Sequence, residues 1–138
     1  MNRVLLIGLV AVSAFAFAPA KRDPYRVVYD LTSRDTLEQK AVLRWIREVH
    51  ESSPGAQMEV VMYSKGIELV MPERSAYIDQ VKDAMKTAKA RFVVCAIALK
   101  NNNVTMSQML PGVESVPDGI YEIVSKQQDH WGYIKVTQ

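Results

Sequence analysis

Residues 91–100, Arg-Phe-Val-Val-Cys-Ala-Ile-Ala-Leu-Lys, hold the pattern that decides the fold. After Arg91 the first half is continuously apolar up to Cys95, which is typical of a strand buried on both faces of a parallel sheet. The second half, from Ala96 to Lys100, is rich in residues that favour helix, so we expect a short helix directly after the strand. A strand that passes straight into a helix predicts an α/β protein.

Strand and helix patterns alternate in both directions from this stretch. The predicted strands are 26–31, 58–63, 91–95, 113–116 and 133–136, and the predicted helices fall within 35–51, 75–88, 96–100 and 117–128. Strands that alternate with helices form βαβ units with parallel neighbours. We therefore expect a three-layer α/β/α sandwich around a mainly parallel sheet of about five strands.

The ends of these strands predict where a site would lie. In open α/β sheets, ligands bind beyond the carboxyl ends of the strands. The residues expected there are Asp30 and Thr32 after the first strand, Tyr63, Lys65 and Gly66 after the second, and Cys95 with Ala96 after the third. Of these, Cys95 is the candidate catalytic residue, and Tyr63, Lys65, Gly66 and Ala96 are the candidate substrate-binding residues.

Cys95 is the only cysteine of the chain and lies where a strand gives way to a helix. The free amide groups and the positive end of the helix dipole at such a position favour the thiolate, which is the nucleophilic form. A cation on Lys65 would add to this effect if it lies within several ångströms. Free cysteine is also one of the most buried residue types and often only fills space in a core. Both interpretations stay open from these residues alone.

The first twenty residues have the pattern of a secretory signal peptide. Arg3 gives a positive start, an apolar run extends from Val4 to Phe17, and small residues follow up to Ala20. The run is shorter than the roughly 20 residues that span a bilayer, which favours cleavage over anchoring. We expect cleavage after Ala20, one domain over residues 21–138, and a periplasmic or secreted protein with no membrane attachment after cleavage.

Composition excludes several classes of function. The chain has 17 basic and 15 acidic residues and no dense basic run, so nucleic acid is not expected as a partner. One cysteine and two distant histidines do not supply a metal site, and the glycine patterns of phosphate-binding and dinucleotide-binding loops are missing. We expect neither a metal nor a cofactor.

Three segments resemble one family. Residues 92–100, Phe-Val-Val-Cys-Ala-Ile-Ala-Leu-Lys, look like the cysteine segment of DsrE/DsrF-like sulfur-relay proteins. Residues 110–119, Leu-Pro-Gly-Val-Glu-Ser-Val-Pro-Asp-Gly, are similar to a segment of the exported members. The ending, with Gln127-Gln128 and Trp-Gly-Tyr-Ile-Lys at 131–135, resembles their C-terminal motif. The resemblance implies a three-layer α/β/α fold, assembly as a homo-oligomer (trimer or hexamer), and sulfur carried as a persulfide on the matching cysteine, Cys95.

The chain departs from the family pattern beside that cysteine. Ile97 and Ala98 stand where exported relatives usually have Asn-Thr, and the turn at 63–66 keeps only the last glycine of a His-Gly-x-Gly pattern. Two hypotheses therefore remain. The chain is a periplasmic sulfur carrier or sulfurtransferase that exchanges sulfur with donor and acceptor proteins or small thiols, or it is a non-catalytic binding or assembly module with Cys95 structural. The apolar residues Ile67 to Met71 are a weak indication of a contact surface between subunits.

Overall fold

The computed structural model describes residues 25–137, so the predicted signal peptide lies outside the described residues. Strands and helices alternate along the chain as the sequence predicts. In chain order, the elements are β1 (Arg26–Leu31), α1 (Thr36–Ser52), β2 (Gln57–Met62), the 3₁₀ helix η1 (Gly66–Val70), α2 (Ile78–Lys86), β3 (Arg91–Cys95), α3 (Ala96–Asn101), the 3₁₀ helix η2 (Met106–Gln108), β4 (Glu114–Val116), α4 (Gly119–Gln128) and β5 (Gly132–Lys135).

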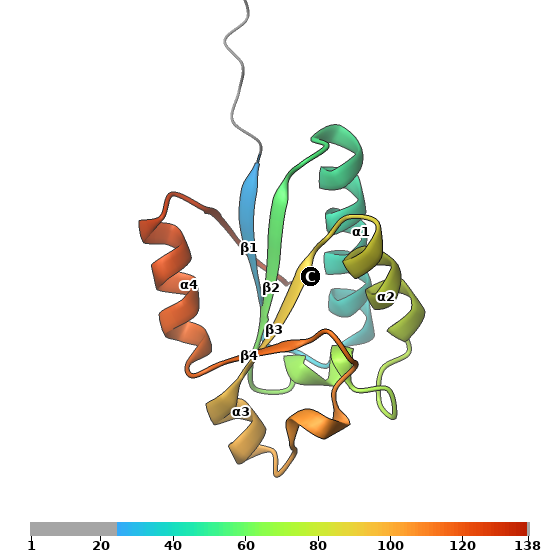
Figure 1. Ribbon diagram of the computed structural model, residues 1–138. Helices are drawn as coiled ribbons and strands as arrows, with labels where there is room; N and C mark the ends of the chain where they lie inside the picture. Colours follow the sequence, from blue (N-terminus) through green and yellow to red (C-terminus); the bar gives the residue numbers. More distant parts are fainter. Residues whose placement is uncertain (1–24, 138) are drawn as a thin grey trace, which may run out of the picture.

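The five strands form one sheet in the order β4-β3-β2-β1-β5, and every neighbouring pair is parallel. The predicted α/β class and parallel sheet are confirmed. Figure 1 shows α1 and α2 on one face of the sheet and α4 on the other. The chain places β2, β3 and β4 on one side of β1 and then returns to place β5 on its other side. The carboxyl ends of β1 and β5 therefore meet where the strand order reverses, which is where such sheets bind ligands.

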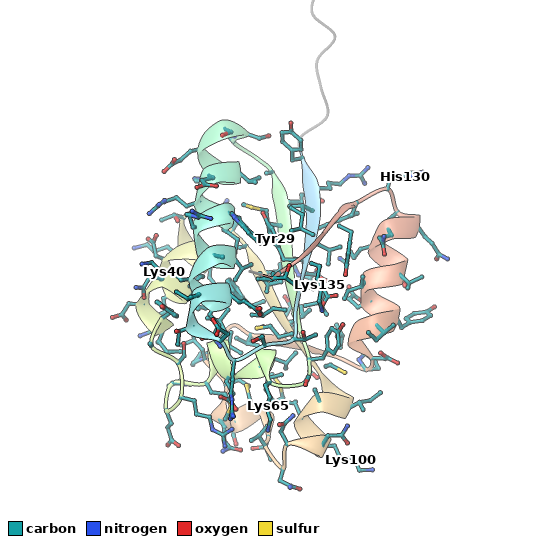
Figure 2. The ribbon with its side chains drawn as sticks, turned by 180° about the vertical axis from the view of Figure 1, so that it is seen from behind. Tyr29, Lys40, Lys65, Lys100, His130 and Lys135 are labelled. Atoms are coloured by element: carbon teal, nitrogen blue, oxygen red, sulfur yellow. The ribbon has the colours of Figure 1, made fainter. Side chains whose placement is uncertain are left out.

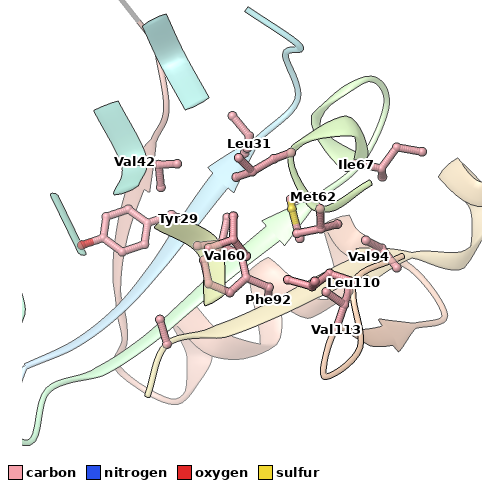
Figure 3. Packing of buried hydrophobic residues seen from close by; sticks show 14 of the residues in the cluster. Tyr29, Leu31, Val42, Val60, Met62, Ile67, Phe92, Val94, Leu110 and Val113 are labelled. Carbon is pink, nitrogen blue, oxygen red and sulfur yellow. The ribbon is translucent and has the colours of Figure 1, made fainter. Parts of the chain in front are cut away.

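The face under α1 and α2 holds the larger core. Alternate residues of the strands point to this face and pack against the two helices and η1 (Figure 3). Its largest fully buried side chains include Tyr29, Leu31, Met62, Ile67 and Phe92. The prediction that Ile67 to Met71 forms a contact surface is wrong, since Ile67, Leu69, Val70 and Met71 are at most 2% exposed inside the chain's own core.

The opposite face has a much smaller core. Only Val28, Val61 and Val93, one from each central strand, meet Ile123 of α4 in a buried cluster. Tyr63, Val116 and Trp131 pack around it and are partly exposed. One ten-residue helix therefore provides the main cover of this face.

A buried carboxylate ties α4 to the sheet. Glu59 of β2 is fully buried. Its Oε2 accepts a hydrogen bond from Arg91 Nη1 at 2.6 Å and forms an ion pair with Lys126 Nζ of α4 at 2.9 Å. Its Oε1 has no hydrogen-bond partner among the described residues. Removal from water raises the pKa of Glu59 above its usual value, an effect larger than the opposing effects of Lys126 and Arg91.

Within residues 25–137, no helix combines the length and the apolar composition that crossing a membrane requires.

Replacing Glu59 with Gln should change how stability depends on pH. Because the pKa of Glu59 is raised by folding, its contribution to stability is full below the pH where an unfolded glutamate ionises, about 4.3, and is lost as the pH rises through the folded value. Urea unfolding from pH 4 upward should therefore show Glu59→Gln gaining stability relative to the native protein. Glu114→Gln is the control with the opposite sign, since the hydrogen bond from Arg91 lowers the pKa of Glu114. Parallel pH profiles for native protein and Glu59→Gln would contradict the expectation.

Replacing Gly66 with Ala should destabilise the fold. A Cβ on Gly66 would overlap the Leu31 carbonyl oxygen and lie 2.7 Å from the carbonyl carbon, both of which are backbone atoms. Overpacking of this kind costs about 1–3 kcal/mol or more, so we expect a loss in that range in urea unfolding. Gly132→Ala is the matched control, because its Cβ would meet Arg26 O at an ordinary 3.5 Å. Equal losses for the two variants would be evidence against a steric role for Gly66.

Candidate functional site

Cys95 ends β3 and directly precedes α3, as the sequence predicts. Alternation along β3 puts its side chain on the side of Val93, next to the first residue of α4, and at this end of the strand it also packs with the larger buried cluster. The residue is only 5% exposed and is the free cysteine of the described chain. The thiol is therefore at the carboxyl edge of the sheet but is buried.

Gly119, the first residue of α4, provides that cover. A Cβ on Gly119 would stand 3.2 Å from Cys95 Cβ, 3.2 Å from Val61 Cγ1 and 3.5 Å from Tyr63 Cδ1. The missing side chain lets the helix backbone approach the thiol closely. Asp118 fixes the helix start there, since its carboxylate accepts hydrogen bonds from Ile120 N at 2.8 Å and Tyr121 N at 3.4 Å.

Tyr63 forms the next wall of the site. It follows β2, its ring borders the same point as Cys95, and it is half-buried. Desolvation, followed by the charge of Asp30, raises the pKa of Tyr63 to about 12. Tyr63 is therefore neutral at physiological pH, and its ring and Cys95 Cβ both border the point where a Cβ on Gly119 would stand. The structure brings this predicted pair together.

A polar cluster lies beyond Tyr63, on β1 and β5. Asp30 is 4% exposed and accepts hydrogen bonds from Tyr133 Oη at 2.7 Å and Lys135 Nζ at 3.1 Å. The same ammonium donates to Thr32 Oγ1 at 3.2 Å and lies 5.6 Å from the centroid of the Tyr63 ring. Desolvation and the hydrogen bond to Asp30 raise the pKa of Tyr133 to about 12. The ion pair of Asp30 and Lys135 and the neutral side chains of Tyr63 and Tyr133 thus border the site.

Sequence reasoning placed Asp30 and Thr32 at this edge but missed Tyr133 and Lys135. Lys135 pairs in register with Asp30, and their side chains share the α4 face. The sequence indicates that residues 133 and 135 lie on the same face of a strand, but it does not indicate that this strand pairs with β1. Strand order is the information that would have identified the pair.

Lys65 has a different environment from the one expected. Its Nζ donates to Asn102 Oδ1 at 2.7 Å, and Asn102 Nδ2 donates to Ala98 O at 2.8 Å and Ser64 O at 3.0 Å. Asn102 caps the C-terminal end of α3, whereas Cys95 precedes its N-terminal end. Figure 2 shows Lys65 at the same end of the molecule as Lys100, with Lys135 nearer the middle. The cation next to Tyr63 is Lys135 rather than Lys65.

The two remaining predicted site residues, Gly66 and Ala96, differ in their environment: one is buried in a turn and the other is exposed on a helix. Gly66 is buried and lets the turn after β2 pack against the end of β1. Ala96 is exposed at the first position of α3. At the two positions where exported relatives usually have Asn-Thr, Ile97 is 50% exposed and Ala98 is buried. No group of three or more histidine, cysteine, aspartate or glutamate side chains in residues 25–137 is arranged to hold a metal ion.

Comparisons with known proteins agree with this geometry. The chain is similar to a solved structure from Methanobacterium thermoautotrophicum, the protein of unknown function MTH1491, with a TM-score of 0.76 and 27% identity over 80% of this chain and 98% of that one. A comparison with curated proteins gives no match. Residues 27–136 match the DsrE/DsrF-like family, a span that runs from the second residue of β1 to just past β5 and contains Cys95, Asp30, Tyr133 and Lys135. The chain therefore belongs to the DsrE/DsrF-like family, whose members are generally sulfur-relay proteins.

Proposed function

We propose that this chain carries sulfane sulfur as a persulfide on Cys95 and acts as a periplasmic sulfur carrier or sulfurtransferase. The observation that carries the proposal is the position of the only cysteine, at the carboxyl edge of the sheet in a family of sulfur-relay proteins. Tyr63 and Gly119 border the thiol and separate it from bulk water.

The proposed transfer balances without an external oxidant or reductant. The Cys95 thiolate attacks the outer sulfur of a donor persulfide, a new S–S bond forms, the donor's S–S bond breaks, and the donor leaves as a thiolate. An acceptor thiolate then attacks the outer sulfur on Cys95, and the Cys95 thiolate is the leaving group. Sulfur moves at an unchanged oxidation level in both steps.

The surroundings favour a small donor over a bulky one. Cys95 is 5% exposed and Gly119 lies against it, so a protein thiol reaches the sulfur only if the first turn of α4 moves. Tyr63 is neutral at physiological pH, as an ordinary tyrosine is, and it therefore adds no charge that would repel an anionic sulfur species. The Lys135 ammonium behind the ring is held by Asp30.

A second candidate function is a non-catalytic binding or assembly module in which Cys95 is structural. The same burial supports this alternative, since Cys95 belongs to the main hydrophobic core. Ile97 and Ala98, in place of the family's usual polar pair, point the same way. Sulfur loading of the native thiol separates the two.

Native protein should gain sulfur mass when treated with polysulfide, and Cys95→Ser should gain none while keeping its fold. Intact-mass analysis measures the loading, and far-ultraviolet circular dichroism checks the fold. The matched control is the double variant Cys95→Ser/Ser107→Cys, which moves the thiol to an exposed position on η2. It should load less than native protein if the site, rather than a thiol alone, favours the persulfide.

Two results would refute the carrier proposal. One is native Cys95 that is alkylated only after denaturation and gains no sulfur. The other is equal loading of the displaced thiol on Ser107→Cys. Either result leaves Cys95 as a structural residue of the core.

Export is the second part of the proposal. The support is the sequence of residues 1–20, with its short apolar run and small residues before Lys21. We expect the mature protein recovered from the periplasm to begin at or near Lys21. N-terminal sequencing of that fraction decides the matter, and Met1 at the N-terminus would contradict it.

Assembly as a trimer or hexamer is the third part. Its support is the family relationship, together with apolar side chains on α4 that are exposed in a single chain. These are Ile120, Tyr121 and Val124, which are 46–74% exposed. Burial of such a surface between subunits would complete the thin cover of the α4 face.

A further inference from the structure

The outer edge of β5 is open. β5 ends the sheet beside β1, so no strand of the described chain pairs with its other side. Val136 N–H donates to Asp30 C=O at 2.9 Å, and backbone groups alternate in direction along a parallel pair. The backbone groups of Ile134 therefore point to β1, and those of Tyr133 and Lys135 point outward. Such an edge is a template for another strand.

The opposite edge of the sheet is better protected than β5. β4 has three residues, lies between Pro111 and Pro117, and carries Glu114, whose Oε2 accepts from Arg91 at 2.8 Å. Short length, proline and charge are the features that prevent pairing of edges. β5 is four residues long and has no proline, and the charge of Lys135 is already paired with Asp30, so covering this edge would leave no charge without a partner.

Apolar surface surrounds the open edge on both faces. Tyr133 is 41% exposed on the α4 face and Ile134 is 38% exposed on the other. A groove of about 430 Å³ lies beside Ile134, with Val27 and Val49 in its lining. Its lining also carries Arg26 and Glu48, side chains of opposite charge, so two copies of this surface can face each other without net repulsion.

We infer that β5 pairs with β5 of a second copy, antiparallel, about a two-fold axis at Ile134. In this register Tyr133 of each copy exchanges backbone hydrogen bonds with Lys135 of the other, so every outward group of both residues is used. The two Ile134 side chains then meet as a non-hydrogen-bonded pair with Cα atoms about 4.5 Å apart. A register centred on Lys135 would instead set two ammonium side chains opposite each other.

This contact joins two copies into one ten-stranded sheet. A two-fold contact alone builds a dimer, and together with a three-fold contact it builds a hexamer. The inference depends on the geometry of β5 and is independent of sulfur chemistry at Cys95.

A cysteine at the axis tests the register. Ile134→Cys, with the buried Cys95 left in place, should form a covalent dimer under mild oxidation about tenfold faster than Lys82→Cys, because only the paired strands bring the two sulfurs into disulfide range. Lys82 is on α2 and its side chain is 57% exposed, so random collisions would favour it. Native protein gives the background rate. Cross-linking of Lys82→Cys at the same rate or faster overturns the inference.

A second arm tests the contact without oxidation. Ile134→Glu places two carboxylates at the axis, so light scattering should show that it loses the two-fold contact that native protein has. Amide hydrogen exchange at Tyr133 and Lys135 should be slow in native protein and fast in Ile134→Glu, whereas the Ile134 position, bonded to β1, should stay slow in both. A monomeric native protein overturns the inference, and slow exchange at Tyr133 and Lys135 in that monomer would assign the edge to another segment of the same chain.

Discussion

The main constraint on this structure is that one face of its sheet is covered mainly by a single helix, α4. Two helices and η1 bury the first face in a large apolar core, while α4 alone meets the second through Ile123. A parallel sheet requires both faces to be covered, so each contact of α4 carries a large share of the fold. Glu59 holds the helix by its C-terminal half through Lys126, and Gly119 brings its first turn onto Cys95 and Tyr63. The candidate site forms where the first residue of α4, Gly119, lies against Cys95 and Tyr63.

The sequence predicted the elements well because their patterns are local. The strands at 26–31 and 91–95 were predicted at the observed limits, and the other three shift by one residue at one or both ends. Ile67 to Met71 was misjudged, since a short apolar run before a proline reads the same whether it is buried or exposed. Solvent exposure of such a run depends on what packs against it, and here the run forms η1 and is buried in the larger core.

The candidate site was predicted only in part, for a related reason. Cys95 and Tyr63 were placed at one edge because each ends its own strand, and they do lie together. Lys65 was considered as a cation for the thiol if it lay within several ångströms, and its ammonium binds Asn102 instead. Lys135 is more than a hundred residues from Asp30 in the sequence, and only the position of β5 beside β1 joins them. Long-range pairing of strands is the information that a single sequence does not contain.

The Asp30 cluster connects the edge of the sheet to the thiol. Tyr133 and Lys135 bind Asp30 with their side chains. Desolvation and then the charge of Asp30 raise the pKa of Tyr63, whose ring borders the same point as Cys95. The backbone groups of the same two residues face outward from β5. A strand paired there would hold Tyr133 and Lys135 in place and so reduce the freedom of the carboxylate they bind. A contact at the outer edge of β5 would therefore act on two residues, Tyr133 and Lys135, whose side chains also bind the carboxylate beside Tyr63.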